Sequence, residues 1–333
     1  MIKCKTTLSS NVRRRIQLKG IGLLVTFIAG FSGAAQVLAK EPDPGGDAVA
    51  VLFKQSEGSL QIAIGGQPIA DYVYRDDQVL RPYFRNLRTL SGVQVTRNHP
   101  PVKGQDIDDH PTMHPGLWLA FGDLNGVDFW RNKGQVRHLR FNEKPQGKAG
   151  HASFSVENVY EAEGRTFCTE ICKIAISVQP AGYVLDWRST FQSKHDFAFG
   201  DQEEMGLGLR VATHLAVSRG GEIFDSESRK NEAGIWGKQA EWCQYSGVID
   251  RQRVGVVVMP APENFRRSWF HARDYGLLVA NPFGQNAFTK GDQSKIKVNP
   301  AGDLHLRFGI VVYETPADQP ADIADLYQKY LKQ

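Results

Sequence analysis

The 333-residue sequence predicts an all-β fold, one large antiparallel sandwich with a C-terminal helix. Short runs of alternating apolar and polar residues recur along the chain, as expected for strands with one buried face. Clusters of Gly, Pro, Asn and Asp separate these runs, and amphipathic helices do not alternate with them, as a parallel α/β sheet would require. We find no internal repeat and no low-complexity linker, so residues 40–333 are expected to form a single domain.

Eight runs are predicted to be strands, and the most regular one lies near the C-terminus. Every second residue of Leu304–Tyr313 is large and apolar, which is typical of a half-buried strand. A helix is predicted at Pro320–Leu331, with Asp318 as its N-cap and Pro320 in its first turn, because the following apolar residues share one helical face. The other predicted strands are Val49–Phe53, Leu60–Ile64, Tyr72–Tyr74, Ala152–Val159, Tyr183–Phe191, Leu207–Val217 and Val254–Met259.

The charge balance argues against a nucleic-acid partner. The chain has 40 Lys and Arg against 36 Asp and Glu, but six of the basic residues lie at or before Lys19. Without those six, 34 basic residues stand against 36 acidic ones, a balance of −2. A nucleic-acid-binding surface needs a basic excess, so we expect no nucleic-acid partner.

Residues 1–39 are predicted to be a signal peptide. Basic residues up to Lys19 precede the apolar run Ile21–Phe31, and Val37-Leu38-Ala39 fits a small-x-small cleavage pattern. Gly20–Ala39 is nearly long enough to span a bilayer, so an uncleaved anchor is the alternative. We expect a periplasmic or extracellular protein with no membrane association after cleavage.

Export would place three cysteines of the mature chain in an oxidising compartment. Cys168 and Cys172 lie on one face of a strand-like run, about 13 Å apart along a strand. That separation is too large for a disulfide. Either residue could pair with Cys243, but three buried free thiols are the simpler expectation.

Three segments concentrate polar residues among glycines and aromatics, a composition that core strands do not explain. They are Asp108–Trp130, Gly200–Arg210 and Asn264–Gly284. A sugar presents apolar C–H faces to aromatic rings and a rim of hydroxyls to polar groups, so this composition favours a carbohydrate site. Tryptophans that only fill the core are the alternative.

The order of these motifs resembles a bacterial family of exported proteins of unknown function, often labelled PmoA-like. The resemblance covers Val49 to Tyr313, and it implies no catalytic assignment. The label derives from a membrane-embedded methane monooxygenase subunit, and this chain has no transmembrane bundle, so that activity is not expected here. In general layout the chain is also similar to the galactose-mutarotase-like supersandwich. The motifs that carry the family resemblance are His110–Trp130, Glu203–Arg210, Ile235–Trp242 with Tyr245-Ser246-Gly247, and Arg273–Gly276 through Asn281–Gly284.

The first candidate catalytic group is the pair His110 and His114. Two imidazoles and a carboxylate are a usual ligand set for Zn or non-haem Fe, so Asp109, His110 and His114 are the candidate ligands of a divalent metal. Without a metal, the same histidines would serve as acid and base or contact a polar ligand, and no other cofactor is expected. The structural alternative is a histidine that binds backbone carbonyls in a tight turn.

Glu203 and His271 complete the candidate catalytic set. A carboxylate hemmed in by glycine and aromatic neighbours would have a raised pKa and serve as a general base, whereas a solvated acidic turn is the alternative. On a short strand, Trp269, His271 and Arg273 would share one face, which offers a stacking ring, a titratable group and a fixed cation.

We expect these residues to converge on one concave face, with the histidines protonating a sugar oxygen, Glu203 acting as base and Arg273 orienting the substrate. The predicted function is cleavage of glycosidic bonds by hydrolysis or elimination. A sugar epimerase and a non-catalytic glycan-binding protein are the alternatives. The residues expected to contact the substrate are Asp109, Trp118, Asp123, Trp130, Asp201, Trp269, Arg273, Asp274 and Asn281.

Overall fold

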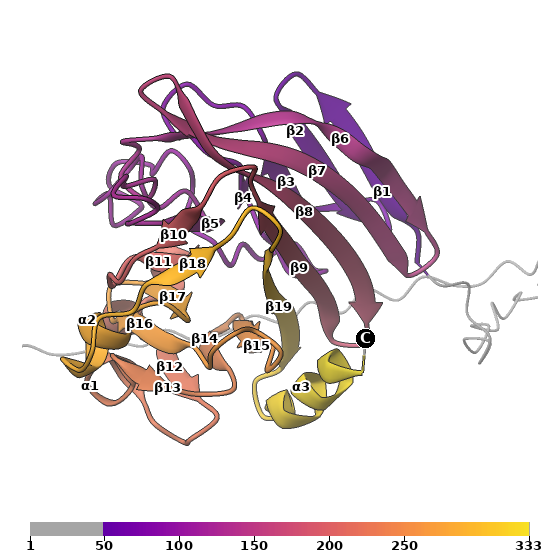
Figure 1. Ribbon diagram of the computed structural model, residues 1–333. Coiled ribbons are helices and arrows are strands. Elements are labelled where there is room, and N and C mark those ends of the chain that lie inside the picture. The colour runs from indigo at the N-terminus through magenta and orange to yellow at the C-terminus, as the bar shows by residue number, and fades with distance from the viewer. Residues whose placement is uncertain (1–48, 333) are drawn as a thin grey trace, which may run out of the picture. The chain divides into compact units, whose positions relative to one another are not determined.

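Two large antiparallel sheets pack on a shared hydrophobic core in the computed structural model, which describes residues 49–332 (Figure 1). The all-β antiparallel sandwich with a C-terminal helix is thereby confirmed. The predicted signal peptide, residues 1–39, lies outside the described residues. Within residues 49–332, no helix has the length and hydropathy needed to span a membrane.

The nine-stranded sheet carries most of the polar motifs. Its central strands come from distant parts of the chain, because β5 pairs with β11, and β11 pairs with β17. In sheet order, its strands are β1 (Val51–Ser56), β2 (Ser59–Ile64), β3 (Gln67–Val73), β4 (Tyr83–Arg85), β5 (Leu117–Phe121), β11 (Met205–Arg210), β17 (Leu277–Asn281), β16 (Trp269–Arg273) and β13 (Lys238–Gln239).

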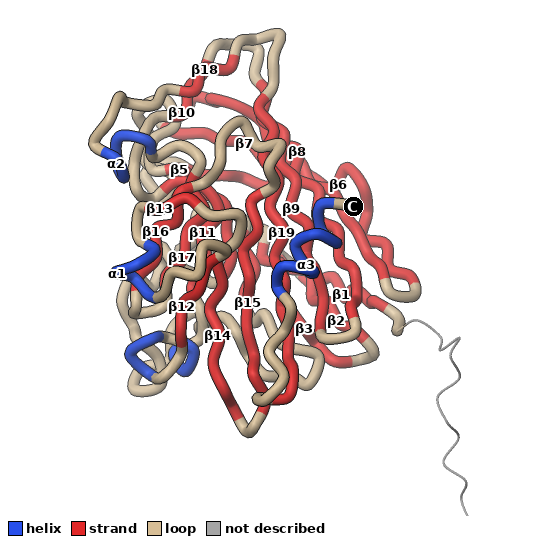
Figure 2. The backbone as a smooth tube through the Cα atoms, turned by 90° about the horizontal axis from the view of Figure 1, so that it is seen from below, coloured by secondary structure: helices blue, strands red, loops and turns tan. Residues whose placement is uncertain are grey.

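The eight-stranded sheet contains the longest strands, which run side by side in Figure 2. A separate pair, β10 (Phe197–Phe199) and β18 (Ile296–Val298), forms a two-stranded sheet. In sheet order, the strands of the eight-stranded sheet are β12 (Glu222–Asp225), β14 (Cys243–Ile249), β15 (Gln252–Pro260), β19 (Leu304–Pro316), β9 (Gly182–Gln192), β8 (Arg165–Gln179), β7 (His151–Ala162) and β6 (Gln135–Lys148).

Alternation along each strand decides which side chains enter the core between the sheets. The five apolar residues that alternate along β19 all belong to this core, as the sequence predicts. Cys168 and Cys172 on β8 face the same core, and both are free thiols, as is the buried Cys243. The prediction of three buried free thiols is therefore confirmed.

The predicted C-terminal helix exists but begins later than expected. Helix α3 spans Ile323–Leu331, and the carboxylate of Asp322 accepts a hydrogen bond of 2.9 Å from the backbone of Asp325. Asp318 as N-cap is wrong, because Gln319 N–H bonds Pro316 and the chain is still turning there. Ile323, Tyr327 and Tyr330 are buried on the outer face of the eight-stranded sheet.

The prediction of a strand at Leu207–Val217 is half correct. Strand β11 ends at Arg210, and two 3₁₀ turns follow, η1 (Thr213–Leu215) and η2 (Val217–Arg219). The turns form because the amides of Leu215 and Ala216 in η1, and of Arg219 and Gly220 in η2, bond carbonyls three residues earlier. Two short helices, α1 (Asn231–Ile235) and α2 (Gln285–Thr289), were also not predicted, since a single turn has no hydrophobic period.

Candidate active site

The register of the nine-stranded sheet aligns the polar motifs across one face. Trp118 on β5 lies opposite Gly208 on β11, Gly208 lies opposite Val279 on β17, and Val279 lies opposite His271 on β16. Paired residues of neighbouring strands point to the same face of a sheet, and successive residues of one strand point to opposite faces. The residues before and after each member of this row fill the core between the sheets, so the row itself lies on the outer face. The next row on the same face runs from Arg210 through Leu277 to Arg273.

Gly208 makes room for the aromatic floor of this face. A Cβ at this position would lie 2.6 Å from the ring of Trp118 and 2.9 Å from that of Trp130. The two tryptophans pack edge to face, with ring centroids 5.1 Å apart, and both are fully buried. They therefore form a floor under the site and present no open ring to a ligand.

The histidine motif lies on this floor. The ring of His114 stacks on Trp118 at 5.3 Å, and the ring of His110 stacks on His114 at 4.7 Å. His114 is buried, and burial together with the nearby Arg210 charge holds its pKa far below the usual value. His114 is therefore neutral near pH 7, which does not favour the expected role of proton donor.

His110 is the exposed member of the pair, with 42% of its side chain accessible. Its Nδ1 lies 2.7 Å from Oδ2 of Asp109. Asp109 also binds Arg97 and Arg210, which are both buried. Burial would raise the pKa of Asp109, but the hydrogen bond from His110 and the Arg210 charge outweigh it and lower that pKa. The ionised carboxylate of Asp109 holds the imidazole of His110 through Nδ1, and Nε2 takes no part in this contact.

A second cluster surrounds Arg273 on the same face. Its Nη1 binds Glu232 at 2.7 Å, its Nε donates to Nε2 of His271 at 2.9 Å, and its Nη2 lies 3.6 Å from the carboxylate of Glu203. The guanidinium also lies 5.6 Å from the ring of Trp236. Arg273 is therefore held by three side chains, and it presents Glu203 at the edge of the cluster.

His271 is a neutral member of this cluster. Its Nε2 accepts a hydrogen bond from Arg273, so Nδ1 carries the ring hydrogen and faces the backbone oxygen of Glu203 at 3.4 Å. Burial, followed by the Arg273 charge, lowers the pKa of His271 to about 4. The 3.9 Å approach of Nε2 to the Glu203 carboxylate is therefore not an ion pair near pH 7. Both ring nitrogens of His271 therefore face groups of the protein, Arg273 and the Glu203 backbone.

Several predicted contact residues instead hold the loop that carries Glu203. Asn281 is fully buried, donates to the carbonyls of Gln202 and Glu203, and accepts from two amides of its own turn. The carboxylate of Asp201 accepts from the amides of Asn286, Ala287 and Ser294. Glu203 itself lies in a bend before β11, not on a strand, and 34% of its side chain is exposed.

Three other predicted residues have local structural contacts. Asp123 accepts from the amide of Gly126 and closes a turn, and Asp274 accepts from the amide of Glu232. Trp269 stacks against Phe288, and the guanidinium of Arg266 lies 5.7 Å from its ring. These contacts place Asp123 and Asp274 in a supporting role.

Sequence reasoning missed four residues that organise the face, namely Arg97, Arg210, Tyr275 and Glu232. The guanidinium of Arg210 lies 4.5 Å from the ring of Tyr275, and that ring lies 6.5 Å from His110. Arg210 shares the parity of Gly206 and Gly208 on β11, a signal that could have placed it on this face. Glu232 lies on a one-turn helix with no such signal.

The two clusters lie on one face, but on separate strands. Trp118 and His271 are three strand spacings apart, about 14 Å. Arg210 and Tyr275 link the Asp109–His110 pair to the strand of Arg273. His110 and Glu203 are both partly exposed. Neither residue lines any of five cavities found in residues 49–332, of which the largest measures about 780 Å³.

The expected metal ligands do not form a ligand cluster. Within residues 49–332, no group of three or more His, Cys, Asp and Glu side chains is placed to hold a metal ion. Two guanidinium groups bind the carboxylate of Asp109, and the rings of His110 and His114 lie stacked at an interplanar angle of 23°. Stacked rings direct their nitrogens along similar planes rather than toward one point.

The fold and this face define a large antiparallel β-sandwich with an Arg, His and Glu surface site. The chain belongs to a family of unknown function (DUF6807), whose sequence model matches residues 59–328. That description carries no activity. The comparison with curated proteins finds no match.

Solved structures similar to the chain include carbohydrate-active proteins. An alpha-galactosidase from Lactobacillus brevis is 9% identical with a TM-score of 0.41, covering 80% of this chain and 39% of its own. A galactose mutarotase-like protein from Clostridium acetobutylicum is 10% identical with a TM-score of 0.36, covering 81% of this chain and 99% of its own. The chain thus spans about two fifths of the alpha-galactosidase, and neither likeness assigns it an activity.

Proposed function

We propose that the protein is an exported enzyme that acts on carbohydrate and uses His110 and Glu203 for proton transfer. One observation carries this proposal. An exposed imidazole oriented by a carboxylate and a partly exposed carboxylate oriented by a guanidinium lie on the same sheet face. Preorganised pairs of this kind are typical of general acid–base sites.

The roles follow from which atoms are already engaged. Asp109 occupies Nδ1 of His110, so Nε2 is the atom that would exchange a proton with the substrate. Arg273 and the buried Asn281 fix the loop of Glu203, so its carboxylate would serve as the partner base. His114 and His271, which are neutral, would position these groups and the substrate.

The ionisation of the neighbouring carboxylates does not favour hydrolysis by a pair of carboxyl groups. Hydrolysis with two carboxyl groups needs one of them protonated. The pKa values of Asp109 and Glu232 are both lowered despite burial, through hydrogen bonds from His110 and Arg273 and from nearby charges. Neither is therefore a proton donor near pH 7.

We therefore place glycosidic cleavage by elimination first. One group of the His110–Glu203 pair would remove the proton next to the sugar carboxylate, a carbon–carbon double bond would form and the neighbouring glycosidic C–O bond would break. The departing oxygen would be protonated by the other group, directly or through a water molecule. Arg210 or Arg273 would stabilise the negative charge that develops on the carboxylate. Sugar epimerisation is the second candidate, because it also needs one acid and one base.

The test compares two adjacent glutamates. Wild type, Glu203→Gln and Glu204→Gln are assayed on acidic and neutral polysaccharides by reducing-end release and by ultraviolet absorbance of unsaturated products. Glu204 binds Arg131 at 2.6 Å, which makes it the matched control. We expect Glu203→Gln to lower kcat about 10²- to 10⁴-fold with nearly unchanged ligand affinity, and Glu204→Gln to retain most activity. Saturable binding without turnover in the wild type would instead establish a glycan-binding protein.

A further inference from the structure

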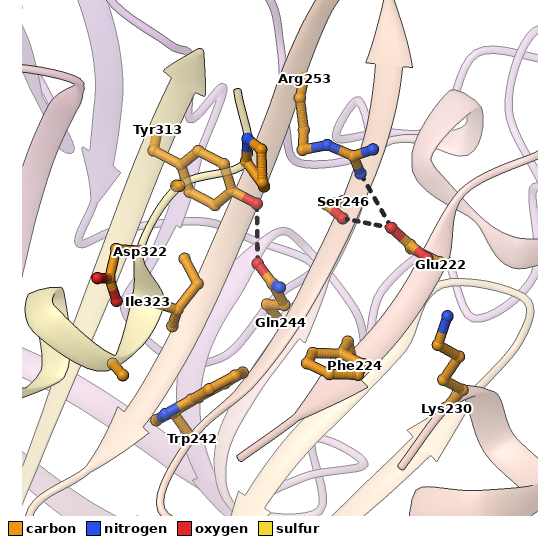
Figure 3. A pocket seen from close by; sticks show the side chains of 13 residues that line it. Glu222, Phe224, Lys230, Trp242, Gln244, Ser246, Arg253, Tyr313, Asp322 and Ile323 are labelled. Carbon is orange, nitrogen blue, oxygen red and sulfur yellow. Dashed lines mark hydrogen bonds and ion pairs between the residues drawn. The ribbon is translucent and has the colours of Figure 1, made fainter. Parts of the chain in front are cut away.

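A pocket of about 390 Å³ lies on the other sheet, on its outer face beside the N-terminal end of α3 (Figure 3). Its floor consists of same-parity residues of β12, β14, β15 and β19, because Glu222 pairs with Ser246, Ser246 with Gly255, and Gly255 with Tyr313. Residues 320–324 close one side. The pocket shares no lining residue with the Arg273 or His110 clusters.

Gly255 gives the floor its shape. A Cβ at this position would lie 2.5 Å from the ring atoms of Tyr313, so only glycine lets that ring lie across β15. The hydroxyl of Tyr313 then donates to Oε1 of Gln244 on β14, 2.8 Å away. The ring is thus fixed at the base of the pocket, with an amide beside it.

Aromatic rings form the second part of the pocket. Phe224 and Trp242 have ring centroids 6.1 Å apart, and Figure 3 shows both lining the pocket together with Tyr313 and Ile323. Rings around a cavity of this size suit a small ligand with a flat or apolar face.

The pocket is lined by two basic and two acidic side chains, Lys230 and Arg253 against Glu222 and Asp322, and their pairing decides which charge a ligand would meet. Glu222 is paired with Arg253 at 2.9 Å and lies 3.4 Å from the hydroxyl of Ser246. Lys230 extends its ammonium to 5.9 Å from the ring of Phe224, and within residues 49–332 this ammonium has no ion-pair partner. The rim residue Asp322 uses its carboxylate to cap α3. One cation is therefore left to meet an anionic group of a ligand.

We infer that this pocket is a second binding site that takes a single sugar unit bearing a carboxylate, that is, a uronic acid. The aromatic rings would contact the C–H face of the sugar, Lys230 would meet the carboxylate, and Gln244, Ser246 and Glu222 would bond hydroxyls. An aromatic acid could satisfy the rings and Lys230, but it has no hydroxyls to bond Gln244, Ser246 and Glu222. The inference does not depend on catalysis, because its test measures binding alone.

The test is calorimetric titration of the full chain with glucuronate, with glucose and benzoate as matched probes. We expect saturable glucuronate binding at least about tenfold tighter than that of either probe. Lys230→Gln should weaken glucuronate binding about three- to tenfold and leave glucose binding unchanged, since one partly solvated charge pair is lost. The matched control is Lys238→Gln, at an exposed lysine outside the pocket, and it should leave glucuronate binding unchanged.

Three results would overturn the inference: no saturable glucuronate binding, benzoate bound as tightly as glucuronate, or glucuronate binding that Lys230→Gln leaves unchanged. Trp242→Phe, which keeps a ring in place, checks the aromatic contact and should weaken glucuronate and glucose alike. Lys230 is exposed, so loss of folding does not obscure its result. Failure of this test leaves the turnover of the Glu203 site unaffected, and the two proposals are thus tested separately.

Discussion

Replacing Asn281 should release the loop that carries Glu203 and lower the stability of the fold. The Asn281 side chain is fully buried and makes four hydrogen bonds, two donated to the carbonyls of Gln202 and Glu203 and two accepted from Phe283 and Gly284. Each such bond contributes about 0.5–1.5 kcal/mol net, and unpaired buried groups cost more. Asn281→Ala should therefore lower the free energy of unfolding by about 2–4 kcal/mol.

Asn281→Asp separates stability from positioning. The carboxylate keeps the two accepted bonds but faces the carbonyls of Gln202 and Glu203 without a donor, so the loop should move while the turn at Phe283 persists. We expect kcat to fall at least about tenfold at temperatures where the variant is fully folded. Urea unfolding and steady-state kinetics on the same samples measure both effects.

Asn264→Ala is the control for this prediction. Asn264 is also buried, and it makes two comparable bonds to the backbone of Arg307, in the other sheet. It should lower stability by about 1–3 kcal/mol with unchanged kcat. Equal losses of kcat in the Asn264 and Asn281 variants, each measured below its unfolding transition, would refute the positioning role.

Three further predictions concern other parts of the chain. Burial raises the pKa of Glu170 in the folded protein, so the wild type should lose stability as the pH rises and this carboxyl group ionises. Glu170→Gln cannot ionise, so in urea unfolding its stability relative to the wild type should increase from pH 5 to pH 8. Gly208→Ala should displace Trp118, lowering stability by about 1–3 kcal/mol and shifting its near-ultraviolet circular dichroism; an unchanged spectrum would contradict the close contact. N-terminal sequencing of exported protein should begin at or near Lys40, whereas intact Met1 in membranes would favour an anchor.

The strands could be predicted from the sequence wherever alternation was regular, as in β19. The site could be predicted only in part. Glycines among polar residues indicated the segments that contain His110 and Glu203. The alternation of apolar and polar residues does not show which strands pair, so the register that joins β5, β11, β17 and β16 could not be predicted.

Ionisation states depend on burial that the sequence does not show. His114 and His271 were predicted to be proton carriers because their residue type allows it, yet both are buried beside arginines and neutral. Glu232 and Arg97 come from a one-turn helix and a loop, where no periodic pattern distinguishes a site residue from a solvated one.

A crystal structure of Glu203→Gln with an acidic oligosaccharide tests the central claim most directly. We predict a sugar on the outer face of the nine-stranded sheet, within hydrogen-bond distance of Nε2 of His110 or of residue 203, and in contact with Tyr275. A crystal soaked to saturation, with lattice contacts clear of this face, that shows sugar only elsewhere or none at all would contradict it.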